Sequence, residues 1–117
     1  MTMETEWVRG VAVVTVEGKL TVDHEAGPLS RTVRGLADEG RTAVVLDLGG
    51  VEYADSLGIE AIVASHISLA KRGGRLVVAG LSPKLRHLLE ITRLSEILET
   101  YPDRARALES LGQASER

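Results

Sequence analysis

Residues 42–59 read Thr-Ala-Val-Val-Leu-Asp-Leu-Gly-Gly-Val-Glu-Tyr-Ala-Asp-Ser-Leu-Gly-Ile. The segment 42–48 is almost continuously apolar, which is typical of a strand buried on both faces of a parallel sheet. A loop is predicted through Gly49 and Gly50, and Asp47 is placed to bond the amides of that loop. Asp55 and Ser56 then stand where a helix begins, so a small hydroxyl lies beside backbone N–H groups that favour an anion.

Two strands and a helix are predicted before this stretch. Residues 7–8 and 11–16 read as strands joined by a tight turn, and Gly18 is predicted to end the second strand. That second strand is apolar on both faces, so we expect it inside the sheet and not at its edge. A helix with an irregular start is predicted over residues 23–37, where apolar side chains share one face.

Helices and strands continue to alternate after residue 59. The predicted elements are a helix over 59–72, a strand over 75–79, a helix over 83–92, a short segment near 94–98 and a last helix opened by Pro102. Gly73 is a natural left-handed cap after the first of these helices. Ser82 followed by Pro83 is typical of a helix start, with serine as the cap and proline at the first helical position.

This order of elements predicts an α/β fold. Helices that follow strands give right-handed crossovers, here onto a mixed, mostly parallel sheet of four to five strands packed against helices. The 117 residues fit a single domain. We place that domain at residues 1–112 and expect a frayed polar tail at 113–117.

Composition excludes several classes of function. The net charge is −3 without a block of like charges, which argues against nucleic acid as the main partner, and the lack of cysteine excludes thiol catalysis. No apolar run approaches the roughly 18 residues of a membrane helix and no signal-peptide core is present, so we expect a cytoplasmic protein without membrane insertion. His24, His66 and His87 lack ligand spacing, so neither a metal nor another cofactor is predicted. His66 is interpreted as a satisfied packing residue on the apolar face of its helix.

The motif that begins the predicted helix is Asp55, Ser56, Leu57, Gly58 and Ile59. Here the sequence resembles the STAS-domain family and, within it, the bacterial anti-sigma factor antagonists. Further matching segments lie at residues 72–76, 82–83 and 88–94, so the resemblance covers nearly the whole domain. The order and spacing of the segments make it specific, because Asp-Ser-x-Gly alone would not be.

The resemblance implies a partner switch and not an enzyme. The unmodified protein would bind an anti-sigma factor of the serine-kinase type and so release a sigma factor, as in bacterial stress responses or sporulation. The kinase would phosphorylate Ser56 and end the complex, and a phosphoserine phosphatase would reset it. The implied chain is a monomer or weak dimer whose partner surface comprises Asp23, Asp55, Ser56, Leu57, Gly58, Ile59 and Glu60.

Two departures from the family pattern bear on the switch, while a third, Arg93 in place of a glycine, is interpreted as a surface change. Leu57 stands where the family has a second hydroxyl, and Glu60 stands where it has a small residue. Glu60 follows Ser56 by one helical turn, so it would repel a phosphate there by roughly a few tenths of a kcal/mol. These departures leave open a second interpretation, a STAS accessory or scaffold subunit of a lipid-transport ABC system or stress-signalling complex without phosphoswitching.

Ser56 and its neighbours also have simpler interpretations. Ser56 as a helix cap alone would be worth about 1 kcal/mol, and Asp55 is an equally suitable capping residue. Gly58 would let another surface approach the backbone closely. A hydrolase nucleophile at Ser56 is disfavoured, because no Gly-x-Ser-x-Gly elbow surrounds it and no acid follows in the expected order.

Overall fold

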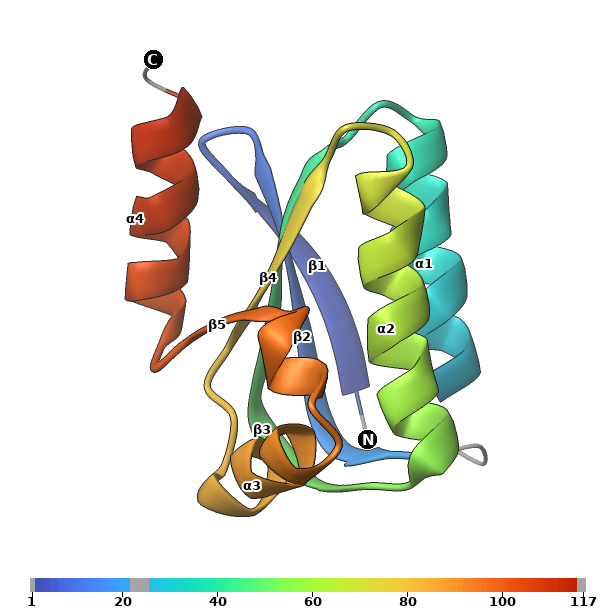
Figure 1. Cartoon of the computed structure of the whole chain (residues 1–117). Coiled ribbons are helices and arrows are strands. Elements are labelled where there is room, and N and C mark those ends of the chain that lie inside the picture. Colours follow the sequence, from blue (N-terminus) through green and yellow to red (C-terminus); the bar gives the residue numbers. More distant parts are fainter. Residues whose placement is uncertain (1, 22–25, 116–117) are drawn as a thin grey trace.

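A five-stranded sheet in the order β1-β2-β3-β4-β5 forms the centre of the protein (Figure 1). The computed structural model describes residues 2–21 and 26–115, so the predicted partner residue Asp23 lies outside the described residues. The strands are β1 (Thr2–Val8), β2 (Val11–Leu20), β3 (Ala43–Ala54), β4 (Arg75–Ala79) and β5 (Glu99–Tyr101). β1 pairs antiparallel with β2, and the remaining neighbours pair in parallel. The predicted α/β fold with a mixed, mostly parallel sheet is confirmed.

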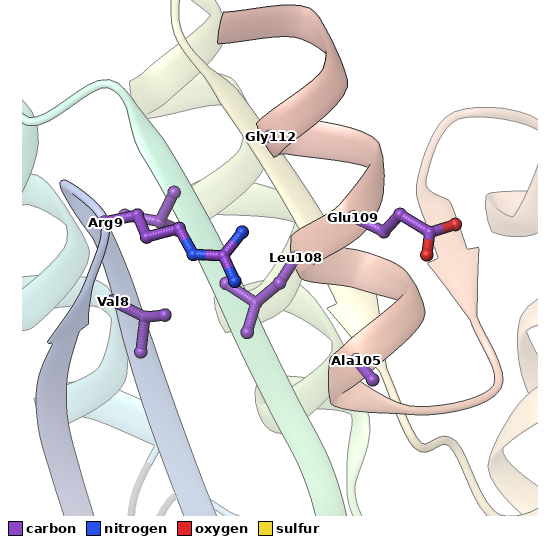
Figure 2. A pocket seen from close by; sticks show the side chains of 7 residues that line it. Val8, Arg9, Ala105, Leu108, Glu109 and Gly112 are labelled. Carbon is purple, nitrogen blue, oxygen red and sulfur yellow. The ribbon is translucent and has the colours of Figure 1, made fainter. Parts of the chain in front are cut away.

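Helices cover both faces of the sheet. α1 (Ala26–Asp38) and α2 (Ser56–Ala70) lie on one face, and α4 (Arg104–Ser115) lies on the other (Figure 1). α3 (Pro83–Ile91) and the short 3-10 turn η1 (Leu94–Glu96) follow β4. Leu108 of α4 points toward the turn between β1 and β2 (Figure 2).

The two covered faces explain why the predicted strands lack alternation. Val44 and Leu46 of β3 belong to the larger core under α1 and α2, whereas Val45 between them belongs to the smaller core under α4. The same division separates Val14 from Val13 in β2. A strand buried on both faces needs apolar residues at every position. The prediction that β2 lies inside the sheet is therefore confirmed.

Two predictions about glycines were wrong. Gly18 does not end β2, because its positive φ of 98° accompanies a shift of register and the strand continues to Leu20. Gly49 and Gly50 do not form a loop, since β3 continues through them to Ala54. Parallel pairing with β2, which includes Glu17 with Gly50, provides the hydrogen-bonding partners that keep this segment extended.

β5 was not predicted from the sequence. It is short and polar, and it forms by pairing with β4, with Glu99 opposite Val77. The cap at Gly73 is confirmed by its φ of 72° and by the adjacent bond from Gly74 N to the Leu69 carbonyl at 2.8 Å. α4 continues to Ser115, while the domain boundary at residue 112 stays a prediction.

Candidate functional site

The chain between β3 and α2 places Asp55 and Ser56 at the end of the sheet where its central parallel strands finish. β3 ends at Ala54, and α2 begins at Ser56 beside the end of β2 (Figure 1). Asp55 N donates a hydrogen bond to the Leu20 carbonyl at 3.3 Å, which ties the start of α2 to β2. Binding sites in open α/β sheets lie preferentially outside the carboxyl ends of the strands.

Asp55, and not Ser56, caps α2. The Asp55 backbone is extended (φ −93°, ψ −176°), and its Oδ1 accepts a hydrogen bond from Gly58 N at 2.8 Å. Its carbonyl accepts the first helical bond, from Ile59 N at 3.0 Å. The capping role considered for Asp55 is therefore confirmed, and the interpretation of Ser56 as the cap is wrong.

Ser56 is the first residue of α2 and is exposed. Within residues 2–21 and 26–115, no hydrogen bond holds its hydroxyl. Leu57, with 42% of its surface exposed, and Glu60 are also exposed in the first turns of the helix. The start of α2 thus presents a hydroxyl, an apolar side chain and a carboxylate to solvent.

Gly58 is buried against the same chain. A Cβ atom at this position would overlap the Leu20 carbonyl oxygen and lie 2.9 Å from the carbonyl carbon. The close approach that Gly58 permits is therefore the approach of α2 to the end of β2. Ile59 is half-buried and packs against the larger core, and Asp55 is half-buried as well.

An apolar groove of about 240 Å³ lies at the same end of the sheet, between β3 and α3. Tyr53 and Ile91 line it with 48% and 64% of their surfaces exposed. Its other lining residues are Glu52, Ala54, Lys84, Leu85, His87 and Leu88. No local sequence pattern indicates this groove, because the groove depends on how α3 folds back beside β3.

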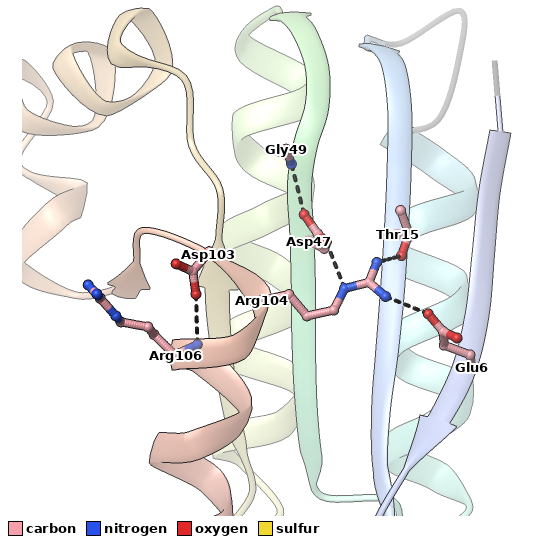
Figure 3. Close-up of polar contacts among 7 residues, drawn as sticks. All are labelled: Glu6, Thr15, Asp47, Gly49, Asp103, Arg104 and Arg106. Atoms are coloured by element: carbon pink, nitrogen blue, oxygen red, sulfur yellow. Dashed lines mark hydrogen bonds and ion pairs between the residues drawn. The ribbon is translucent and has the colours of Figure 1, made fainter.

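A polar cluster around Arg104 was also missed (Figure 3). Arg104 at the start of α4 donates to Asp47 Oδ2 at 2.9 Å, to Glu6 Oε1 at 2.6 Å and to Thr15 Oγ1 at 2.7 Å. Asp47 Oδ1 also accepts from Gly49 N at 2.9 Å, so the predicted bond from Asp47 to a following amide is confirmed. Arg104 thereby ties α4 to three strands of the sheet, which is a structural role.

An ion pair and a histidine lie near β4 and β5. Arg75 donates to Glu99 through Nε at 2.8 Å and Nη2 at 2.7 Å, and this hydrogen bonding holds the pKa of Glu99 below its ordinary value. His66 on α2 is half-buried, but its Nδ1 atom is buried and has no hydrogen-bond partner among the described residues. The interpretation of His66 as a satisfied packing residue is therefore wrong for this nitrogen.

The geometry around Ser56 is unsuited to a serine hydrolase. His66 lies on the same helix, about 15 Å further along its axis at about 1.5 Å per residue, so it is too far from Ser56 to act as its base.

In the described part of the chain, no group of three or more His, Cys, Asp or Glu residues could hold a metal ion. Over the same residues, none of the helices has both the length and the apolar character required to cross a bilayer.

The α/β fold agrees with the comparison to known families. The sequence model of the STAS domain matches residues 2–107. The chain therefore belongs to the STAS domain family.

Similar proteins within the family carry a regulatory name. The anti-sigma F factor antagonist of Paenibacillus polymyxa is 29% identical over 93% of each chain. The crystal structure of an anti-sigma factor antagonist from Mycobacterium paratuberculosis is 28% identical, covers 93% of this chain and 92% of that one, and superposes with a TM-score of 0.82. The structure of the Bacillus cell fate determinant SpoIIAA in its phosphorylated form shares the fold. It is 17% identical, covers 94% of this chain and 99% of that one, and superposes with a TM-score of 0.74. Antagonists of this kind are regulatory binding proteins and not enzymes, in agreement with the sequence analysis.

Proposed function

We propose that this protein is an anti-sigma factor antagonist that binds a serine-kinase anti-sigma factor through the start of α2. Binding releases a sigma factor, phosphorylation of Ser56 by the kinase ends binding, and a phosphatase restores it. The two relatives named above as anti-sigma factor antagonists support the partner class. The contacts of Asp55 and Gly58, together with the exposure of Ser56, support the position of the switch.

The observation that carries this proposal is that Asp55 caps α2, whereas the Ser56 hydroxyl does not take part in capping. Asp55 caps the helix, so the Ser56 hydroxyl is exposed and has no bond to a described residue. A kinase can therefore modify Ser56 without removing an interaction that holds the fold. A phosphate at this position lies at a helix N-terminus, where the dipole and the free N–H groups favour an anion.

The effect of phosphorylation is then exerted on the interface and not on the fold. A phosphoserine adds about −1.5 to −2 charges at neutral pH. In a complex, that charge would be desolvated beside the carboxylates of Asp55 and Glu60, which repel it. Leu57 and Tyr53 expose apolar surface beside this point, so a partner that covers them would exclude the water a phosphate needs.

The test is a pull-down of partner proteins, followed by a measurement of their affinity, with three forms of the whole protein. Immobilised wild-type, Ser56→Ala and Ser56→Asp proteins are incubated with lysate of the native host, and bound proteins are identified by mass spectrometry. We expect the first two to capture an anti-sigma factor with a serine-kinase domain, and Ser56→Asp to capture little. In calorimetry with the purified partner, Ser56→Asp should bind at least about 30-fold more weakly, because a charge at the centre of an interface costs ~2 kcal/mol or more.

Ser68→Asp is the matched control. Ser68 lies on α2 as well, about 18 Å further along the helix axis, so the variant adds the same charge outside the proposed interface. Its affinity should stay within about threefold of wild type. Equal affinity of Ser56→Asp and wild type would refute the switch, and equal weakening by Ser56→Asp and Ser68→Asp would place the effect outside the interface.

Glu60 favours one alternative, a constitutive STAS accessory or scaffold subunit. Its exposed carboxylate stands one turn after Ser56, where it opposes both a phosphate and an acidic kinase site. This function predicts capture of a membrane ATPase or a signalling complex, with Ser56→Asp bound as well as Ser56→Ala.

A further inference from the structure

A second groove lies at the opposite end of the sheet from Ser56, between the β1–β2 turn and α4 (Figures 1 and 2). Its volume is about 430 Å³, which falls within the range of small-molecule sites. Of its lining residues, Val11 is buried and Leu108 of α4 is half-buried. Most of the lining is apolar and comes from Val8, Val11, Ala105, Leu108 and Gly112.

Arg9 supplies a positive charge to this apolar groove. Its side chain extends from the turn toward Leu108 across the open space (Figure 2). Among residues 2–21 and 26–115, its guanidinium has no hydrogen-bond or ion-pair partner. An arginine without a partner over an apolar surface is complementary to a ligand that has an anionic head and an apolar body.

The backbone of Arg9 is also unusual. Its φ of 52° lies in the left-handed region, and Gly10 follows with φ of 82°. Turns of this kind favour Asn, Asp or Gly at the first central position, so turn chemistry does not explain an arginine there. Strained backbone of this type is found preferentially at functional sites.

Glu109 is the other charged residue of the lining, and it does not neutralise Arg9. Its carboxylate points away from the groove (Figure 2), and no ion pair joins it to Arg9 in the described chain. Arg9 and Glu109 are both exposed, so water screens both charges. Of the two, the guanidinium is the charged group that extends over the groove (Figure 2).

We propose that this groove binds a small amphiphile with a carboxylate head and a linear apolar tail. The head pairs with the Arg9 guanidinium, which can hold a carboxylate with two parallel hydrogen bonds. The tail lies along Val8, Val11 and Leu108. The site is separate from the Ser56 surface and does not depend on the function proposed for it.

The test is an NMR titration of the whole ¹⁵N-labelled protein with decanoate, kept below its micelle concentration. We expect saturable shifts of the Val8, Arg9, Leu108 and Gly112 amides. Arg9→Gln should weaken decanoate binding about tenfold and leave decanol binding unchanged, because only the carboxylate uses the guanidinium. Glu109→Gln is the charge control, and its decanoate affinity should be equal to or higher than that of wild type.

Gly112→Leu tests the location without disturbing the fold. A Cβ atom at Gly112 meets nothing within 4 Å, so a leucine side chain has space to fill the groove. Leucine also has the higher helix propensity, so the variant should unfold at or above the wild-type temperature while losing binding of both probes. The proposal is overturned by an absence of saturable shifts, by shifts centred on the Tyr53–Ile91 groove, by unchanged binding in Gly112→Leu, or by equal binding of decyltrimethylammonium.

Discussion

Gly58→Ala should destabilise the protein strongly, because the start of α2 rests directly on the end of β2. The new Cβ would overlap the Leu20 carbonyl oxygen and lie 2.9 Å from the carbonyl carbon and 3.2 Å from Leu20 Cγ. Favourable contacts between carbon atoms lie near ~3.5–4.0 Å, so the helix start must move away from the strand. The two nearest atoms belong to the Leu20 backbone, so rotation of a side chain cannot relieve the overlap.

The expected cost combines three effects. Overpacking of this kind costs about 3 kcal/mol. The movement also breaks the hydrogen bond from Asp55 N to the Leu20 carbonyl, now 3.3 Å long, at about 1 kcal/mol. The higher helix propensity of alanine offsets about 1 kcal/mol of this destabilisation. The free energy of unfolding should therefore fall by about 3 kcal/mol, which corresponds to about 12 °C in Tm for a domain of this size.

The assay is urea denaturation followed by circular dichroism, together with a thermal scan. Gly35→Ala is the matched control, since Gly35 lies within α1 and a Cβ there meets nothing within 4 Å. That variant should gain up to about 1 kcal/mol. A Gly58→Ala protein within about 0.5 kcal/mol of wild type would refute the reasoning, because ordinary surface changes fall within that margin.

Three further predictions concern caps and ion pairs. Asp55→Ala should lower the free energy of unfolding in urea by about 1 kcal/mol, while Asp55→Asn, which keeps an acceptor oxygen, should lose much less; equal losses would show that the cap is not the cause. The Arg75 guanidinium holds the pKa of Glu99 low, so this carboxylate stabilises the fold above its ordinary pKa and loses that effect as the pH falls through its lowered pKa. The thermal stability of wild type relative to Glu99→Gln should thus stay constant from about pH 7 to about pH 5 and decline at lower pH, and a constant difference down to about pH 3 would contradict this. Arg104→Met, which leaves Asp47 and Glu6 without their guanidinium, should cost about 1 kcal/mol in low salt and less in about 1 M salt, as thermal scans at both concentrations would show.

The central strands could be predicted from the sequence because a strand buried on both faces is apolar at successive positions. Val44, Val45 and Leu46 are apolar in succession since α1 and α2 cover one face and α4 covers the other. β5 has no such run of apolar residues. Its residue Glu99 is polar and exposed, and the strand exists because β4 offers a parallel edge and Arg75 binds the carboxylate.

The site could be predicted only in part. The motif places Ser56 at a helix start, but aspartate and serine are nearly equal as caps, so the sequence alone does not decide between neighbours. The structure decides for Asp55, whose carboxylate reaches Gly58 N while Gly58 packs on Leu20. The groove between β3 and α3 and the contacts of Arg104 join segments far apart in the chain, and no local pattern records them.

Intact-mass analysis of the protein purified from its native host, with fragmentation to map the modified residue, tests the phosphoswitch most directly. We predict a fraction of molecules with one phosphate, located on Ser56 and absent from Ser56→Ala. A protein that carries no phosphate under any growth condition, or carries it only on another residue, would contradict the switch and favour the constitutive adaptor.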